Sequence, residues 1–151
     1  MQNIEQLFCK HRDDVYRLAL SYTRSTQEAE DVSQTVFLKL MEQETIAPGK
    51  EKAWLMQVTA NECRNLLRSS WWRKTEDLNE TLTMPAPEYS DVFQSVMSLP
   101  PRYRVVIYLR YYEEYTTQEI AQLLHISQSA VTTRLNRARQ MLKPTLEEVS
   151  V

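Results

Sequence analysis

Amide, hydroxyl and guanidinium side chains gather on one predicted helix near the C-terminal end of the chain, over residues 128–142. Asn and Gln amides pair with adenine in the major groove, threonine methyl groups contact thymine, and arginines bind backbone phosphates. The pattern indicates DNA binding, with a plain helical hairpin of polar outer face as the alternative. The side chains predicted to be exposed on it are Gln128, Ser129, Thr132, Thr133, Asn136, Arg137 and Gln140. Those near its N-terminal half are expected to meet base edges, and Arg134, Arg137 and Arg139 are the predicted phosphate contacts.

The elements that must present this helix are those of a helix-turn-helix. Thr116–Glu119 has the pattern of a capping box and opens a first helix that we expect to end at His125. Ser127 is the predicted N-cap of the second helix, and the small Ala121 allows the two helices to approach closely. Such motifs commonly have glycine at the turn, where this chain has His125. Histidine is somewhat enriched at positive φ among the other residues. The space between the helices is predicted to be filled by Ile126, Val131 and Leu135.

Residue types that carry catalysis or bind metals form no recognisable site in the sequence. The two histidines, His11 and His125, lie in different halves of the chain, and Cys9 and Cys63 lack metal-ligand spacing. Glycine-rich phosphate loops, H-E-x-x-H and nucleophile elbows are absent from the sequence. We therefore predict no catalytic residue, no metal site and no cofactor, and an enzyme is the disfavoured alternative.

The rest of the chain is predicted to be all-α. Glycine occurs once, at Gly49, whereas sheet-rich folds use many glycine-containing turns. Apolar residues recur every three or four positions over 4–22, and Ser25–Glu28 is a second capping-box pattern, opening the next helix. A loop is predicted over 44–52. Further helices are expected at 53–70, 92–99 and 102–112. Pro100-Pro101 ends the second of these and suits the first turn of the third, whose Val105–Ile107 run has strand propensity.

The charges and prolines divide the chain into two small helical domains joined by a flexible linker. The predicted boundaries are 1–74, 75–90 for the linker and 91–151. Basic residues outnumber acidic ones by four to one in both 61–74 and 116–144, and 75–91 carries five acids and no base. With a net charge of -2, the isolated chain is expected to bind DNA weakly. The absence of a signal peptide or membrane span, together with two thiols, indicates a cytoplasmic protein without membrane insertion.

Five motifs in order resemble a known family over about residues 4–142. They are Ala29–Phe37, Ala53-Trp54-Leu55 with Asn61 seven residues past the tryptophan, Leu99–Arg104, Gln118–Ala121 and Arg134–Arg139. In this order they are similar to bacterial RNA polymerase sigma factors of the extracytoplasmic-function (ECF) group, in the sigma-70 family. The resemblance implies a factor that binds core RNA polymerase and promoter DNA, directs promoter-specific initiation and is held inactive by an anti-sigma factor. A repressor or a sigma-like adaptor is the alternative.

The resemblance implies separate roles for the residues of the first domain. A polymerase-docking surface is expected at Glu30, Asp31, Gln34 and Phe37, with the alternative that Phe37 is a core residue. The minus-ten element is expected to meet 54–68, with Asn61 holding an unstacked base and Arg64 and Arg68 on the strand backbone. Trp54 fits the core better than a stacking platform. For Trp71 and Trp72, stacking on single-stranded DNA and anchoring an interface both stay open.

The helix-turn-helix would then read the upstream, minus-thirty-five element. The family commonly has lysine or arginine where this chain has Thr132. Threonine makes no bidentate contact to guanine, so the base preference is expected to differ from the family's usual one.

Overall fold

The computed structural model describes the backbone of residues 3–43, 45–68 and 91–149 and the side chains of 3–43, 45–68 and 93–142. Within these ranges all regular structure is helical, as predicted. The chain divides into two compact units, Met1–Thr83 and Met84–Val151. The predicted linker, 75–90, lies outside the described residues, and so do Trp71 and Trp72.

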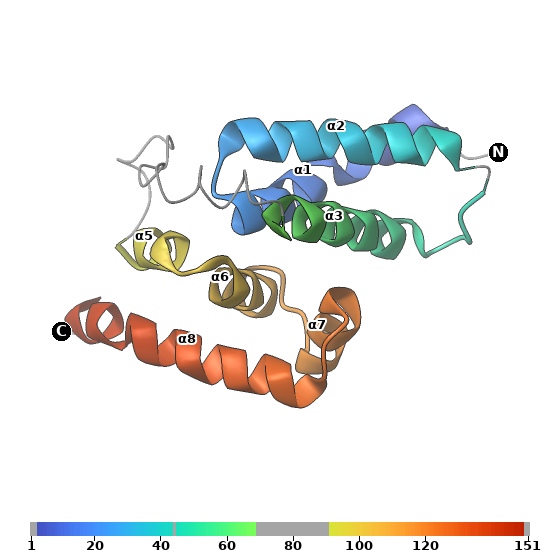
Figure 1. Cartoon of the computed structure of the whole chain (residues 1–151). Helices are drawn as coiled ribbons and strands as arrows, with labels where there is room; N and C mark the ends of the chain where they lie inside the picture. The colour runs from blue at the N-terminus through green and yellow to red at the C-terminus, as the bar shows by residue number, and fades with distance from the viewer. Residues whose placement is uncertain (1–2, 44, 69–90, 150–151) are drawn as a thin grey trace. The chain divides into compact units, whose positions relative to one another are not determined.

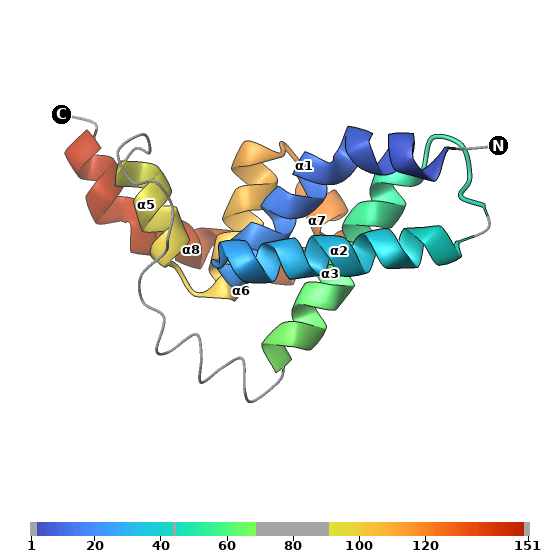
Figure 2. The same ribbon diagram turned by 90° about the horizontal axis from the view of Figure 1, so that it is seen from above.

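The first unit is a bundle of α1 (Ile4–Thr23), α2 (Thr26–Glu42) and α3 (Glu51–Arg68). Each of these helices packs against the other two, and α3 crosses the α1–α2 pair obliquely (Figures 1 and 2). The apolar stripes that predicted the helices face one another because burying them together removes their surface from water. The core side chains with at most 1% exposure are Val15, Leu18, Ala19, Ala29, Val36, Leu40, Leu55, Met56, Ala60 and Cys63.

The turn between α1 and α2 corrects one detail of the predicted Ser25–Glu28 capping box. Ser25 Oγ accepts a hydrogen bond from the backbone N–H of Glu28 at 3.2 Å, as expected of an N-cap. The backbone N–H of Ser25, however, donates to Thr23 Oγ1 at 3.3 Å. The Thr23 hydroxyl thus takes the place that the Glu28 carboxylate was predicted to fill, because Arg24 adopts a left-handed conformation (φ 55°) that folds the chain back.

The predicted loop 44–52 is shorter than expected, since α3 begins at Glu51 rather than at residue 53. A turn closed by the Lys50 N–H to Ala47 carbonyl bond, 3.0 Å, contains Gly49 at φ 82°. The Lys50 carbonyl then accepts the Trp54 N–H at 3.0 Å. The turn therefore delivers the chain directly into the first turn of the helix, and no spacer is needed.

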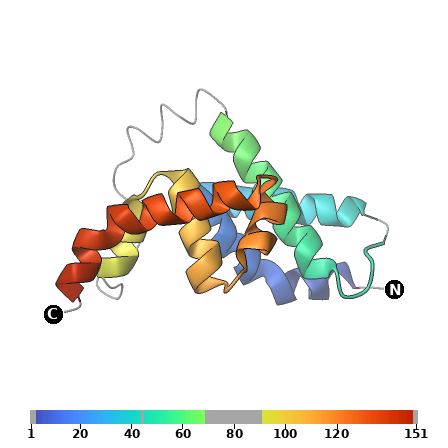
Figure 3. The ribbon, with the colours of Figure 1, turned by 90° about the horizontal axis from the view of Figure 1, so that it is seen from below.

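The second unit contains α5 (Asp91–Ser98), α6 (Pro101–Ile107), a π-helical turn η2 (Tyr108–Tyr112), α7 (Thr117–Leu124) and α8 (Gln128–Val149). Helices α5, α6 and α7 all pack against α8 (Figure 1), and α7 crosses its N-terminal end steeply (Figure 3). The predicted helix 102–112 is therefore real, but its last turn is a π-turn. Val105, Val106 and Ile107 are at most 2% exposed, so tertiary burial overrides their strand propensity.

Helix α8 is longer than predicted. We expected it to end near Leu142, but it continues to Val149 and passes through Pro144. A proline inside a helix removes one backbone donor and disfavours the helix without always ending it. The sequence pattern therefore placed the end of this helix about two turns too early.

Arg104 is the most deeply buried charged side chain among the described residues, at 1% exposure. It lies on α6, and its Nη1 donates to the Leu99 carbonyl at 2.8 Å and to the Met97 carbonyl at 3.4 Å. These carbonyls belong to the C-terminal end of α5 and the residue after it, where helix carbonyls lack partners within the helix. Arg104 therefore caps α5 from the neighbouring helix.

Candidate nucleic-acid interface

The first helix of the helix-turn-helix begins with the predicted capping box. Thr116 Oγ1 accepts the Glu119 N–H at 3.1 Å, and the Thr116 N–H donates to Glu119 Oε1 at 3.0 Å. Hydrogen bonding to the carboxylate, first from the backbone N–H and then from the side chain of Thr116, lowers the pKa of the Glu119 carboxyl because it favours the ionised form. This residue pair fixes where α7 starts.

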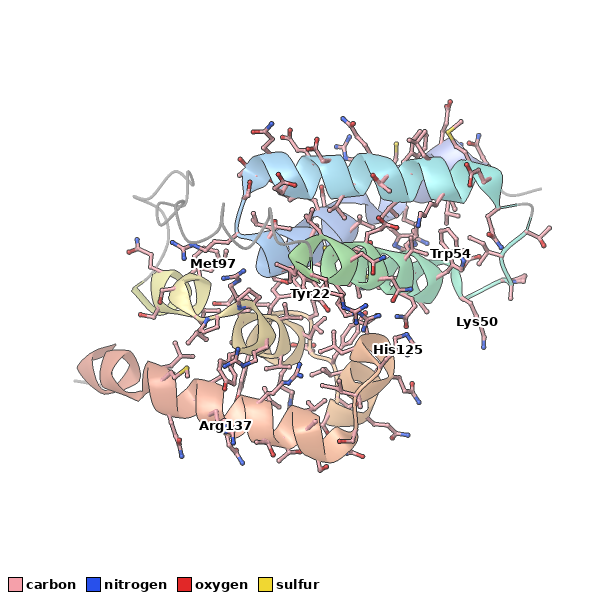
Figure 4. All side chains as sticks on the ribbon, viewed as in Figure 1. Tyr22, Lys50, Trp54, Met97, His125 and Arg137 are labelled. Carbon is pink, nitrogen blue, oxygen red and sulfur yellow. The ribbon has the colours of Figure 1, made fainter. Side chains whose placement is uncertain are left out.

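The turn between α7 and α8 also follows the prediction (Figure 4). His125 is the C-cap of α7 in the left-handed conformation, φ 56° and ψ 43°. The backbone N–H groups of His125 and Ile126 both reach the Ala121 carbonyl, the latter at 3.1 Å. Ser127 Oγ accepts the Ala130 N–H at 3.1 Å and caps α8. Histidine thus occupies, in the left-handed conformation, the position where glycine is common.

The space between the two helices is filled largely by the side chains that the sequence singled out. Val131 and Leu135 are at most 2% exposed, and Ile126 is half-buried. Ala121, at 9%, leaves room for the close approach of α8. The helix-turn-helix is therefore a packed unit whose opposite face is open to solvent.

The outer face of α8 presents most of the predicted DNA-binding side chains. Gln128, Ser129, Thr132, Thr133, Asn136 and Arg137 are exposed, whereas Arg134 is half-buried on one flank. Gln128 Nε2 donates to Thr117 Oγ1 at 2.8 Å and ties the start of α8 to α7. The Thr132 hydroxyl donates to the carbonyl of Gln128 at 3.1 Å, so its hydrogen is already used within the helix.

Two arginines of α8 interact with aromatic residues: Arg137 with Tyr103 of α6, and Arg139 with Tyr111 of η2. Side-chain hydrogen bonds from Arg102, and to a smaller extent from Arg137, lower the pKa of the Tyr103 hydroxyl. Arg137 lies midway along α8 (Figure 4). Arg139 Nη1 donates to Asn136 Oδ1 at 3.0 Å. Bidentate pairing of Asn136 with adenine needs both its carbonyl and its amino group, so such pairing competes with this bond.

In the first unit, Asn61 and Arg64 lie side by side on α3. The Asn61 Oδ1 accepts hydrogen bonds from Arg64 Nη2 and from Gln57 Nε2, the latter at 3.3 Å. Arg68 is exposed, seven positions beyond Asn61 and therefore on the same face. Trp54 is half-buried at the other end of that face (Figure 4). The structure thus brings the predicted minus-ten residues onto one helix surface.

An ion pair that the sequence did not reveal joins α2 to α3. Lys39 Nζ contacts Glu62 Oε1, and the two residues lie 23 positions apart in the chain. Glu62 is the one acid in the basic segment 61–74. Because Lys39 pairs with it, the acid is neutralised next to Asn61 and Arg64.

The outer face of α2 carries Glu30, Asp31 and Gln34, all exposed, as predicted for a docking surface. Phe37 is half-buried, and its ring centroid lies 4.8 Å from that of Phe8 on α1. Phe37 therefore packs within the bundle along one edge while part of its surface reaches solvent.

Two apolar residues that the sequence reading did not single out continue the outer face of α2. Leu38 is 59% exposed and Met41 is 54% exposed. They follow Gln34 at i+4 and i+7, which places them on one face with it. An apolar residue on the side opposite the core stripe is the signal that identifies them.

Among the described residues, no helix is both long and apolar enough to span a membrane. The same part of the chain holds no group of three His, Cys, Asp or Glu side chains placed to bind a metal ion.

Comparison with known proteins places this chain in a family. The family model of sigma-70 region 2 matches residues 7–73, and that of sigma-70 region 4 matches 91–142. The chain therefore has the two helical modules of a sigma-70 factor. It belongs, more narrowly, to the ECF RNA polymerase sigma factors: it is 31% identical to SigM of Bacillus subtilis over 93% of both proteins.

Other relatives and a solved structure agree with this assignment. SigV of Bacillus subtilis is 28% identical over 88% of this chain and 84% of SigV. SigE of Mycolicibacterium smegmatis is 28% identical over 99% of this chain, which spans 64% of the longer SigE. The fold is also that of the sigma factor RpoE from Bartonella quintana, solved with the anti-sigma factor NepR, with a TM-score of 0.73 at 21% identity over 95% of this chain and 96% of RpoE.

Family membership decides between the classes of function that the sequence left open. The protein is a sigma factor that binds core RNA polymerase and directs promoter-specific initiation with two helical modules. It is not an enzyme, since phosphodiester synthesis belongs to the polymerase, and the repressor and adaptor readings are set aside.

Proposed function

We propose that residues 1–74 bind core polymerase and the minus-ten element, that 91–151 bind the minus-thirty-five element, and that 75–90 link them. The observation that carries this assignment is the order of the two family regions, 7–73 and 91–142, each of which falls on one compact unit. Run-off transcription of a genomic DNA library with core polymerase and the full chain tests it. A set of transcripts that share two spaced promoter elements is the expected result, and the absence of promoter-specific transcripts refutes it.

The polymerase-docking surface is the outer face of α2, formed by Glu30, Asp31, Gln34, Phe37, Leu38 and Met41. Leu38 and Met41 supply an exposed apolar stripe, and the carboxylates and amide beside it supply polar contacts. Such a mixed face suits helix-to-helix recognition, in which apolar anchors are buried and polar side chains set the register.

The docking surface is tested by replacing Leu38 with aspartate. Burial of an unpaired carboxylate at the interface is expected to weaken core-polymerase binding by at least about tenfold. Leu38→Met keeps the apolar surface and serves as the matched control, with affinity near wild type. Equal affinity of Leu38→Asp and wild type in a fluorescence titration excludes this face of α2 from the interface.

On α3, Asn61 captures an unstacked base of the minus-ten element, and Arg64 and Arg68 hold the strand backbone. The hydrogen bonds from Gln57 and Arg64 orient the Asn61 amide and direct its amino group away from them. The ion pair with Lys39 offsets the charge of Glu62, the one acid in residues 61–74, and so reduces its repulsion of the DNA backbone.

In vitro transcription with core polymerase tests the minus-ten assignment. The Asn61→Ala, Arg64→Ala double variant is expected to bind core polymerase like the wild type and to lose promoter opening, measured by permanganate reactivity of unpaired thymines. Open complexes at wild-type level with this variant exclude Asn61 and Arg64 from strand capture.

On α8, base edges are read by Gln128, Ser129, Thr132, Thr133 and Asn136, and phosphates are held by Arg134 and Arg137. Thr132 offers a methyl group for thymine rather than a donor pair for guanine, which supports a base preference of this chain's own. Arg137→Ala in the holoenzyme is expected to weaken binding to promoter and unrelated duplex alike. A loss confined to the promoter would instead mark Arg137 as a base contact.

The protein works in the cytoplasm and is restrained by an anti-sigma factor that covers the polymerase- and DNA-binding faces. Support comes from RpoE of Bartonella quintana, a protein of the same fold solved with the anti-sigma factor NepR. Cell fractionation tests the location, with recovery in the soluble fraction expected. The anti-sigma factor is tested by competition: a protein that binds this chain and displaces it from core polymerase supports the proposal. A protein that binds this chain without displacing it from core polymerase contradicts the proposal.

A further inference from the structure

The π-turn η2, Tyr108–Tyr112, joins α6 to the loop before α7. Its wide turn is closed by the Glu113 N–H to Tyr108 carbonyl bond at 3.2 Å, followed by the Tyr115 N–H to Leu109 carbonyl bond at 2.9 Å. Such turns are rare and often occur at functional sites. Here the extra residue in the turn changes the direction in which successive side chains point.

The two tyrosines at the end of the turn consequently have different partners. Tyr112 stacks on Tyr108, with centroids 6.0 Å apart, and meets Phe93 edge-on at 6.3 Å. Tyr111 contacts α8 instead: its hydroxyl accepts a hydrogen bond from Arg139 Nε at 2.6 Å. The guanidinium carbon of Arg139 lies 5.6 Å from the centroid of the Tyr111 ring. Tyr112 thus packs against α5 and the start of the π-turn itself, whereas the preceding residue, Tyr111, binds an arginine of α8.

Arg139 is fixed at two of its nitrogen atoms and remains exposed. Nε is bound to Tyr111 Oη, and Nη1 donates to Asn136 Oδ1 at 3.0 Å. The Nη2 group is left to donate to a ligand, because a guanidinium carries donors on all three nitrogen atoms. Asn136 lies on the exposed face of α8 proposed to meet DNA, so Arg139 is anchored beside that face.

A second guanidinium lies near the same ring. The guanidinium carbon of Arg110 is 5.9 Å from the centroid of Tyr111. Within the described part of the chain, neither Arg110 nor Arg139 forms an ion pair with a carboxylate. Two cations beside one aromatic ring favour the approach of an anion, and on a DNA-binding face the anion is a backbone phosphate.

We propose that Tyr111 is a positioning residue for DNA binding: it orients Arg139 so that the free edge of the guanidinium binds a phosphate of the upstream promoter element. Arginine side chains carry a large rotamer entropy, and part of this is lost before binding when the guanidinium is held in place. The aromatic hydroxyl therefore raises DNA affinity without touching DNA. The inference rests on the proposed role of 91–151 in binding the upstream element.

A double-mutant cycle in the full holoenzyme tests the coupling. The probes are a duplex with the strongest promoter recovered by run-off transcription and an unrelated duplex of equal length. Arg139→Gln is expected to weaken binding to both about tenfold and to reduce the slope of log Kobs against log salt by about 0.9, the value for one phosphate. Tyr111→Phe is expected to weaken binding about threefold in the wild-type background and not at all in Arg139→Gln.

The control is Tyr112→Phe, which removes the same hydroxyl from the neighbouring residue of the turn and is expected to bind DNA like the wild type. Thermal unfolding of each variant monitors the fold. The proposal is overturned if Arg139→Gln leaves the salt slope unchanged, if Tyr111→Phe has no effect, or if Tyr111→Phe weakens binding equally in both backgrounds. A wild-type chain that yields no promoter refutes the proposed function itself, so the two failures are distinguishable.

Discussion

The buried arginine of α6 gives the sharpest prediction about the stability of the DNA-binding unit. Arg104 is 1% exposed and donates from Nη1 to the Leu99 and Met97 carbonyls at 2.8 and 3.4 Å. Arg104→Met keeps an unbranched side chain but removes every donor. The two carbonyls at the end of α5 then lose the buried cation that caps them.

The magnitude follows from these contacts. A hydrogen bond from a charged donor contributes about 1.5–3 kcal/mol, and the 3.4 Å bond adds little to the 2.8 Å one. The substitution also removes the desolvation cost of a buried charge, which offsets part of this loss. We expect a net destabilisation of about 2 kcal/mol, equivalent to about 30-fold in an opening equilibrium.

Hydrogen exchange on the full chain, read by mass spectrometry, measures this change. Backbone amides of α5 and α6 are expected to exchange about 30-fold faster in Arg104→Met, whereas those of α1, α2 and α3 keep their wild-type rates because they belong to the other unit. The control is Arg102→Met, which removes an exposed guanidinium 4.6 Å from the centroid of the Tyr103 ring and is expected to cost less than about 1 kcal/mol. Unchanged exchange in Arg104→Met, or an equal effect of both variants, refutes the capping role.

Four further predictions follow from individual side chains. His125→Gly is expected to stabilise the second unit by about 1 kcal/mol, because His125 has φ 56°; a lower thermal midpoint would contradict the strain argument. Thr116→Ala is expected to cost about 1 kcal/mol through loss of the α7 cap, seen as faster amide exchange in α7, and unchanged exchange would mean that the cap contributes nothing. Iodoacetamide is expected to label Cys9, which is exposed, and to spare Cys63, whose burial raises its thiol pKa, until the chain is unfolded; rapid native labelling of both would place Cys63 at the surface. For the same reason the first unit is expected to lose stability above about pH 9, where the unfolded thiol ionises and the folded one does not, and a flat free energy of unfolding across that pH range would speak against it.

Features decided by neighbouring residues were predictable from the sequence. The capping box at Thr116, the left-handed His125 and the N-cap Ser127 each depend on atoms within four residues, so their order alone located the helix-turn-helix. The exposed strip on α8 followed from the helical period. The strand propensity of Val105–Ile107 did not change the prediction of a helix, because the neighbouring patterns are helical, and the structure confirms that helix.

Features that join distant segments were not predictable. Lys39 and Glu62 are 23 positions apart, and Tyr111 and Arg139 are 28 apart. The local sequence around each of these residues does not identify its partner, because the distance within each pair is set by how the helices pack. The register change of the π-turn likewise depends on η2 packing between α6 and α7.

For this sigma factor, then, the sequence by itself determined the helices, the two modules and the polar face of α8 that is exposed to solvent, because hydrophobic period and capping chemistry act locally. Only the tertiary structure decided which charges remain free for a ligand. Arg104 caps α5 and Glu62 pairs with Lys39, whereas Arg139, bound at Nε by Tyr111 and at Nη1 by Asn136, keeps Nη2 for a ligand. The physical reason is that a side chain's availability depends on which groups packing brings within about 3 Å of it.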